Sequence, residues 1–478
     1  MASKLLIQRI VNLNHGFLKD IFYKSCRKYV STLHVSGRNA NKICAFVLPY
    51  LDFDERFDDI DGLQKEIQLR KLNMDVIEMK KAWDFYKSIE TKYLTLEYRK
   101  QEISMMIMSL LNKTEKTSLD EQELVKLRLQ VKMIKQDMKN VKEIQWDLDE
   151  TIIEKLLKLP NKLDERTPPS TPLILQNVGK PLILENNKKN HIEIGETLDL
   201  IQYKDPMNYY LLKDAALFEF ELLHFAGKML TDNNVMRITG SDFCRSVLIE
   251  ASGLNHENPA DTFILENDDE PVMDIISRMH LVGGTSLSSM LGLHAKQLIK
   301  LDHLPIKYYS VGRQYTPVSN ETMPSGLFSV GQASTVNIFL ILKDTDSMEN
   351  TIEFNKMLEI INDFYSNITN HYRVVMRSAP ELLTCEKMRV SIELWSPFLE
   401  QYIEVGHLSL HGKYFSKRLL IGYETTDKVK EFASIISGTM LSVPRIIGCL
   451  LEENPDKFVI PSKILKQLSD YRTINTDN

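Results

Sequence analysis

The sequence predicts an α+β protein in which a long antiparallel helical hairpin precedes a larger core of mixed helices and strands. From about Asp59 to Leu159 the chain is almost free of glycine and proline and is rich in helix formers. Beyond Pro172, strand-like runs alternate with amphipathic helical segments. Between Pro305 and Leu342, two such runs flank a loop rich in proline, serine, asparagine and glycine, which predicts strand, long loop, strand.

The composition indicates a globular protein with a sizeable core. The 478 residues are 43% hydrophobic and 26% charged, and the length suggests two or three domains. A net charge of -6 argues against nucleic-acid binding over the whole surface but allows a local basic patch. No apolar run approaches the length of a membrane span. The cysteines show no C-x-x-C pair or zinc spacing, which is typical of a reducing compartment: Cys26, Cys44, Cys244, Cys385 and Cys449.

Residues 1–45 differ in composition from the rest of the chain. Their basic residues are interleaved with apolar ones, and Asp20 is their single acid. This composition is typical of a mitochondrial transit segment, and it predicts a location in the matrix. An ordinary basic N-terminal tail is the alternative. The basic residues are Lys4, Arg9, Lys19, Lys24, Arg27, Lys28, Arg38 and Lys42.

Residues 46–165 are predicted to form the hairpin. Apolar residues recur at alternating spacings of three and four, which predicts two helices with narrow apolar seams. The segment 112–120 breaks the pattern, and Ser118 followed by Glu121 resembles a capping box at the start of the second helix. The seam residues are Ile89, Tyr93, Leu96, Ile103, Ile107 and Leu110 in the first helix, and Leu124, Leu127, Val131, Ile134, Met138 and Val141 in the second.

Basic residues gather at and beyond the tip of this hairpin. In an acidic protein, such a group predicts contacts with nucleic-acid phosphates. A solvated coiled-coil face is the alternative interpretation. The candidate RNA-binding residues are Lys113, Lys116, Arg128, Lys132, Lys135 and Lys139.

The strand, loop, strand segment carries a family resemblance. Its letters YYSVGRQY, followed by GLFSVGQ and an apolar strand, resemble motif 2 of class II aminoacyl-tRNA synthetases, and the closest pattern is that of seryl-tRNA synthetases. Residues 280–292, 390–419 and 435–468 resemble further segments of that family, in the same order, and the predicted hairpin resembles its tRNA-binding arm. The resemblance implies that residues 166–478 form a class II core with a mostly antiparallel sheet.

The resemblance also assigns roles to particular residues. Arg313 would contact the ATP α-phosphate, Glu404 would bind magnesium and Arg445 would reach the γ-phosphate. Other positions depart from the family pattern. Tyr315, Ser329 and Ala333 stand where a carboxylate, an arginine and a phenylalanine bind ATP, Leu287 and Asn337 replace two glutamates of the serine pocket, and His407 replaces a serine beside Glu404.

These departures predict a degenerate ATP and serine site. A phosphate clamp needs fixed positive charge, and a buried ammonium group needs a carboxylate partner. The side chains of serine, alanine, leucine and asparagine supply neither the positive charge for a phosphate nor the negative charge for an ammonium group. His407 could be a metal ligand, but a lone histidine on a strand is more often a structural residue. We therefore expect no catalytic residues, no cofactor and no metal site.

The pattern of losses resembles the noncatalytic seryl-tRNA synthetase-like proteins of insect mitochondria. It implies a structural or regulatory partner of the catalytic mitochondrial seryl-tRNA synthetase, forming a heterodimer with it and supporting tRNA-Ser aminoacylation. Two alternatives remain. One is a nucleic-acid or protein-binding module in mitochondrial DNA maintenance, and the other is a residual seryl-tRNA ligase that depends on Arg313, Glu404 and Arg445. A symmetric homodimer is the competing assembly.

Overall fold

The computed structural model describes residues 31–35, 47–113, 117–183, 189–265, 278–318, 326–343 and 347–464. Most of the predicted transit segment and the candidate residue Lys116 therefore lie outside the described residues. The chain divides into two compact units, one formed mainly by residues 74–159 and the other mainly by residues 160–478. No described helix combines the length and apolar character that crossing a bilayer requires.

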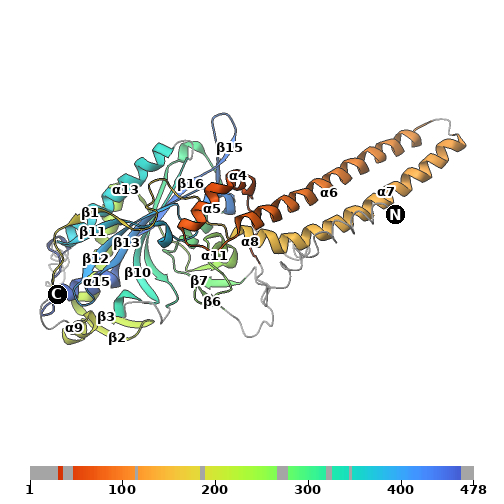
Figure 1. Cartoon of the computed structure of the whole chain (residues 1–478). Coiled ribbons are helices and arrows are strands. Elements are labelled where there is room, and N and C mark those ends of the chain that lie inside the picture. The colour runs from red at the N-terminus through yellow and green to blue at the C-terminus, as the bar shows by residue number, and fades with distance from the viewer. Residues whose placement is uncertain are drawn as a thin grey trace. The chain divides into compact units, whose positions relative to one another are not determined.

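The first unit contains the predicted helical hairpin. α6 (Val76–Leu111) and α7 (Ser118–Leu148) run antiparallel beside each other (Figure 1). The short helix α4 (Phe53–Phe57) precedes them, and η1 (Asp149–Ile153) and α8 (Glu154–Leu157) continue from α7. The predicted hairpin is confirmed, because both helices are long and only a short connection separates them.

The predicted seams lie between the two helices. Leu124, Leu127, Ile134 and Met138 are buried against Ile103 and Leu110, and the remaining seam residues are buried or half-buried. The predicted cap is wrong by one residue. Thr117 is the N-cap of α7 and Asp120 is its partner, because the Thr117 side chain accepts the Asp120 N–H while the Asp120 carboxylate accepts the Thr117 N–H.

The second unit is built on an eight-stranded sheet with the strand order β1-β11-β12-β13-β16-β10-β9-β4. Neighbouring strands are antiparallel except at one edge, where β4 pairs with β9 in parallel. This confirms the class II core with a mostly antiparallel sheet. The strands are β1 (Leu173–Val178), β4 (Met236–Ile238), β9 (Ile306–Tyr315), β10 (Gln332–Leu342), β11 (Tyr372–Met376), β12 (Met388–Ser396), β13 (Gln401–Gly412) and β16 (Ser434–Ser442).

Three helices cover one face of this sheet. α10 (Lys213–Asp232), α13 (Ser347–Ile368) and α15 (Val443–Glu453) pack against its central strands, as Figure 1 shows for α13 and α15. Their apolar residues, including Phe218, Phe364 and Ile447, form the main hydrophobic core with alternate residues of the strands. α15 begins at Val443 and accommodates Pro444 in its first turn, where proline needs no helical N–H bond.

Shorter elements complete the second unit. They are α5 (Ile60–Leu69), whose residues divide between the units, α9 (His191–Thr197), β2 (Ile201–Asp205), β3 (Asn208–Leu211), β5 (Phe243–Arg245), α11 (Ser246–Ala251), β6 (Phe263–Leu265), β7 (Met279–Leu281), α12 (Leu287–His294), β8 (Leu298–Ile299), η2 (Leu301–His303), η3 (Gly326–Phe328), η4 (Ala379–Glu381), α14 (Tyr414–Leu419), β14 (Gly422–Glu424) and β15 (Lys430–Phe432).

Candidate functional site

Two cavities lie beside each other along β9, β10, β13 and β16 in the second unit, and they share several lining residues. The first has a volume of about 410 Å³ and the second about 310 Å³. Both volumes are in the range of sites for small molecules. Arg389 and His407 line both cavities.

Eight of the nine site residues predicted from the sequence line these cavities. Ser329, Ala333, Glu404 and Arg445 line the first cavity, and His407 lines both. The second cavity is lined by Leu287, Tyr315 and Asn337. The fold therefore brings together residues that are far apart in the sequence.

The ninth residue, Arg313, lies on the opposite face of the sheet. It pairs with Ser334 across β9 and β10, and its side chain contacts β3 and α10, which line neither cavity. Its Nη1 lies 3.4 Å from the Tyr209 hydroxyl, and its Nη2 lies 3.7 Å from Glu219. Gln314 lines both cavities instead. Arg313 thus supplies no positive charge to the cavities in this arrangement.

Glu404 is held in a network of ion pairs. Its Oε1 pairs with Arg389 and lies 3.6 Å from His407 Nδ1. Its Oε2 accepts hydrogen bonds from Ser391, at 2.6 Å, and from Arg377, at 3.3 Å. Both oxygens of the carboxylate are therefore occupied by side chains of this protein.

The network extends to two further carboxylates. Glu393 pairs with Arg373 and, at 2.6 Å, with Arg377. Glu386 lies 3.6 Å from Arg389 and accepts a hydrogen bond from Ser409 at 2.7 Å. Three largely buried carboxylates thus face three guanidinium groups, so these charges balance, and the more exposed Glu381 also pairs with Arg377, at 3.3 Å.

Burial and the neighbouring charges shift the pKa values of this region. Burial raises the pKa of Glu404, but Arg389, His407 and other donors outweigh burial and lower it to about 2. Burial, with Arg389, lowers the pKa of His407 to about 3. Burial also lowers the pKa of His411 to about 4. At neutral pH Glu404 is ionised and both histidines are uncharged.

Arg445 has a structural role in this conformation. Its Nε donates to the Phe328 carbonyl at 3.1 Å, and its Nη1 donates to the Glu404 carbonyl at 2.9 Å. It therefore ties the first turn of α15 to η3 and to β13. Because main-chain oxygens already accept from two of its nitrogens, fewer of its donors are available for a phosphate.

In the second cavity, Leu287 is the first residue of α12, and the preceding Ser286 caps that helix. Asn337 is 7% exposed, and its Nδ2 donates to the Thr285 carbonyl at 2.7 Å and to Gln314 Oε1 at 3.0 Å. Gly438 allows β16 to approach β13 here, because a Cβ at this position would lie 2.1 Å from the His407 carbonyl oxygen.

These residues do not suit a magnesium-bound nucleotide. Magnesium prefers carboxylate oxygens, but Glu404 is already neutralised by Arg389 and Arg377. Ser329 and Ala333 offer neither a fixed positive charge nor a flat apolar surface. Within the described residues, no group of three or more histidine, cysteine, aspartate or glutamate side chains is placed to hold a metal ion.

The sequence analysis missed the two central arginines of the network, Arg377 and Arg389. A signal for one of them is present in β12, where Arg389, Ser391 and Glu393 alternate with Val390, Ile392 and Leu394. Two-residue alternation puts polar side chains on one face of a strand. If both faces of the sheet are covered, a strand whose polar face carries both a basic and an acidic residue predicts a buried ion-pair site.

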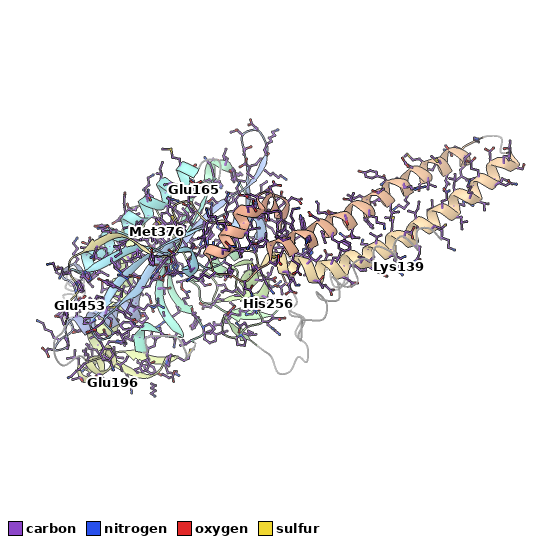
Figure 2. The ribbon with its side chains drawn as sticks, in the orientation of Figure 1. Lys139, Glu165, Glu196, His256, Met376 and Glu453 are labelled. Carbon is purple, nitrogen blue, oxygen red and sulfur yellow. The ribbon has the colours of Figure 1, made fainter. Side chains whose placement is uncertain are left out.

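On the hairpin, four of the predicted RNA-binding residues form one stripe along α7. Arg128, Lys132, Lys135 and Lys139 recur at spacings of four, three and four, and all four are exposed. Figure 2 labels Lys139. The structure gives these four no ion pair with another described residue. Lys113, in contrast, pairs with Asp120 at 2.8 Å.

Comparisons with known proteins agree with this architecture. The family described as "tRNA synthetase class II core domain (G, H, P, S and T)" matches residues 276–454. The serine--tRNA synthetase-like protein Slimp of Drosophila melanogaster is 26% identical over 434 residues, covering 90% of each chain. The mitochondrial serine--tRNA ligase of Mus musculus is 23% identical over 427 residues, covering 86% of this chain and 80% of the mouse protein.

Solved structures show the same fold. The seryl-tRNA synthetase of Pyrococcus horikoshii, crystallised with ATP, superposes with a TM-score of 0.74 at 20% identity, covering 87% of this chain and 97% of that one. The cytoplasmic serine-tRNA ligase of Naegleria fowleri, in complex with AMP, gives a TM-score of 0.68 at 17% identity, covering 86% of this chain and 94% of that one. Both superpositions include the helical hairpin and the core.

Proposed function

Because this chain belongs to the class II seryl-tRNA synthetase family, we propose that it is a noncatalytic paralogue that acts in mitochondria as a structural or regulatory partner of the catalytic mitochondrial seryl-tRNA synthetase. In this role it supports aminoacylation of tRNA-Ser and mitochondrial translation. The similarity to a protein named synthetase-like and to a mitochondrial serine--tRNA ligase supports this assignment. The basic, acid-poor residues 1–45 support the mitochondrial location.

The observation that carries the proposal is the balanced network around Glu404. In a site that activates an amino acid, charged side chains must be available to bind ATP, magnesium and the ammonium group of the amino acid. Here Arg377 and Arg389 occupy the carboxylate of Glu404, and Leu287 and Asn337 carry no charge. The scaffold around them is complete, since the sheet and its helices are well packed. The fold is retained, but the charged groups of the site are already paired with each other. This combination suits a protein that acts by binding other macromolecules through its surface.

One surface suits pairing through the core. α10 exposes Phe220 to 55%, and the edge strand β4, which follows it, exposes Met236 to 61%. An edge strand with exposed apolar neighbours is a favourable site for association with another chain. We place the interface with the catalytic enzyme at this edge.

Coexpression of the two proteins tests the pairing. We expect light scattering to give the mass of a mixed dimer, because each chain would bury its apolar edge against the other. Replacing Phe220 and Met236 with aspartate should weaken that dimer by at least about tenfold, since two charges would be desolvated at the interface.

The matched control replaces Val429, an exposed apolar residue between β14 and β15, with aspartate. This change should leave the dimer intact. Two separate homodimers, with no mixed species and no effect on the charging rate of the enzyme, would refute the proposed partnership.

We further assign nucleic-acid binding to the hairpin arm, through the stripe formed by Arg128, Lys132, Lys135 and Lys139. The stripe spans twelve residues of α7, so its ends are separated by eleven helical rises, about 16 Å. A linear row of exposed cations on a long helix suits successive phosphates of one strand. tRNA-Ser is the expected ligand, because the arm belongs to a seryl-tRNA synthetase-like protein.

Removal of two of these charges should reduce the salt dependence of binding. Each phosphate contact releases counterions, so the double change Lys132→Ala and Lys135→Ala should lower the slope of log affinity against log salt by about two. Lys80→Ala with Lys81→Ala removes the same charge from the base of α6 and should leave the slope unchanged. Titrations with tRNA-Ser and with duplex DNA should be compared. An unchanged slope for both ligands would exclude the stripe as the binding site.

A further inference from the structure

The outer face of α6 carries a second apolar stripe in addition to its seam against α7. The members of this stripe are separated by four, seven and three residues, and at about 100° of rotation per residue they gather on the side of α6 roughly opposite the seam. Their side chains are between 47% and 68% exposed. The residues of this α6 outer stripe are Leu94, Tyr98, Met105 and Met108.

The second helix of the arm, α7, carries a corresponding stripe on its own outer face. Val125, Leu129 and Met133 follow one another at spacings of four and lie roughly opposite the seam residues of α7. Each of the three side chains is more than half exposed, and together they form the α7 outer stripe. Both helices are therefore apolar on two opposite sides, and the hairpin itself buries the seam side.

The outer stripes exceed what the hairpin needs for its own stability. A helix in a two-helix hairpin requires one apolar seam, and its remaining surface is normally polar. A row of large exposed apolar side chains is typical of a surface that another chain covers. The spacings of four, seven and three in the α6 outer stripe are those of a heptad seam, so this stripe suits a second helix.

Charge selects the kind of helix that fits the α6 outer stripe. Between positions 90 and 109, Glu90, Glu97 and Glu102 are the charged residues nearest to this stripe, because the basic residues of that segment lie on the far side of the helix. An acidic border repels nucleic-acid phosphates and anionic lipid headgroups. The matching helix should therefore have an apolar stripe with a basic border.

The α7 outer stripe meets this requirement. Lys126 and Lys132 border its two sides, and the acids nearest to this face, Glu121 and Asp137, lie beyond its ends. Both lysines are exposed. Within one hairpin the two outer stripes face away from each other, because each lies opposite a shared seam. The complement of the α6 outer stripe is therefore available on another copy of the chain.

From this complementarity we propose that the α6 outer stripe of one copy packs against the α7 outer stripe of a second copy of this chain. The contact is heterologous, because different faces of the two copies meet. In a pair, each arm keeps one outer stripe free, so further copies can add and the arms line up in a row. The association concerns the arm and does not rest on the proposed pairing of the core or on nucleic-acid binding.

Charge reversal in the full chain, free of nucleic acid, tests this contact by sedimentation equilibrium. The average mass of the wild-type protein should rise with concentration without stopping at a dimer. Glu97→Lys with Glu102→Lys gives both outer stripes basic borders, and Lys126→Glu with Lys132→Glu gives both acidic borders. Each variant alone should associate at least about tenfold more weakly than the wild type, whereas an equimolar mixture should associate again, because basic borders then meet acidic ones.

A second pair of variants tests the apolar part of the contact. Tyr98→Gln with Met105→Gln removes the centre of the α6 outer stripe and should weaken association at least about tenfold. Met106→Gln with Leu111→Gln is the matched control, because both residues are exposed apolar residues of α6 that lie outside the stripe. This control should associate like the wild type.

Three results would overturn the proposal. They are a wild-type mass that stays constant with concentration, a charge-reversed variant that associates as strongly as the wild type, and a mixture of the two charge-reversed variants that stays unassociated. None of the substituted residues is buried, and circular dichroism of each variant verifies that the helices of the arm are retained. Any of these results would leave the proposed pairing through Phe220 and Met236 untouched, because those residues belong to the core.

Discussion

Purified protein should show no serine-dependent exchange of pyrophosphate into ATP above the background rate. The reason lies in the residues that line the two cavities. Leu287 and Asn337 carry no charge for the ammonium group of serine, and Ser329 and Ala333 replace groups that would hold a nucleotide. Arg313 lies on the opposite face of the sheet.

The expected effect is large. A preorganised charged contact in such a site typically contributes roughly 2 to 4 kcal/mol to the transition state. The loss of three such contacts therefore lowers the rate on the order of 10⁴-fold or more. Glu404 cannot compensate, because Arg377 and Arg389 already pair with its carboxylate.

The exchange assay should include the catalytic mitochondrial enzyme at the same concentration as a positive control. It should also include the variant Arg445→Ala. Serine-dependent exchange by the wild-type protein that disappears in Arg445→Ala would contradict the assignment, since Arg445 lines the first cavity and donates to the Glu404 carbonyl.

Replacing Glu404 with glutamine should destabilise the core unit by about 3 kcal/mol at pH 7. Removal of one member of a buried ion-pair network leaves its partners charged and desolvated, which costs about 3 to 5 kcal/mol. Here Arg377 and Arg389 retain Glu393 and Glu386 as partners, so we expect the lower end of that range. The shift in the pKa of Glu404, from 4.5 to about 2, corresponds to a similar free energy.

This stabilisation should depend on pH in a defined direction. The pKa of Glu404 is lower in the folded protein than in the unfolded chain, so the unfolded state binds more protons between the two values. The contribution is therefore complete above about pH 4.5 and is lost as the pH falls toward 2. His411 is present in both proteins, so its titration largely cancels in the difference between wild type and Glu404→Gln. Glu404 raises the pKa of His407, so the variant should lower that pKa.

Chemical denaturation followed by the fluorescence of Trp395, which lies on β12, measures this difference in the core unit. Trp83 and Trp146 would be replaced by phenylalanine in every protein compared, so that Trp395 is the remaining reporter. Glu359→Gln, at an exposed position on α13, is the control and should change stability by less than about 0.5 kcal/mol. Equal stability of the two variants, or a difference that persists unchanged to pH 3, would show that the network does not stabilise the core.

The hairpin could be read from the sequence because its determinants are local. The seams from Ile89 to Leu110 and from Leu124 to Val141 follow the helical period, and the same apolar spacing recurs at each helical turn. The predicted helix cap was wrong by one residue, because Thr117 and Ser118 are adjacent and both are good caps. Thr117 is the residue whose partner, Asp120, completes both hydrogen bonds.

The strand, loop, strand segment was also predicted correctly as β9 and β10, and their pairing is antiparallel. Its assignment of Arg313 to the nucleotide cavity is not supported by the geometry. The Arg313 side chain instead contacts Tyr209 on β3 and Glu219 on α10, and this packing between distant segments is not specified by the strand pattern. Gln314, the next residue along β9, lines the cavities.

By itself, the sequence determined the order of the elements, the apolar seams, the basic stripe on α7 and the absence of charge at Leu287 and Asn337. These are properties of residue type and local period. Only the tertiary structure decided that Arg377 and Arg389 neutralise Glu404. That contact requires β12 to lie between β11 and β13, with a shift of register between Ile392 and Glu393. Pairing between distant strands depends on the whole sheet, and no local pattern around Glu404 specifies it.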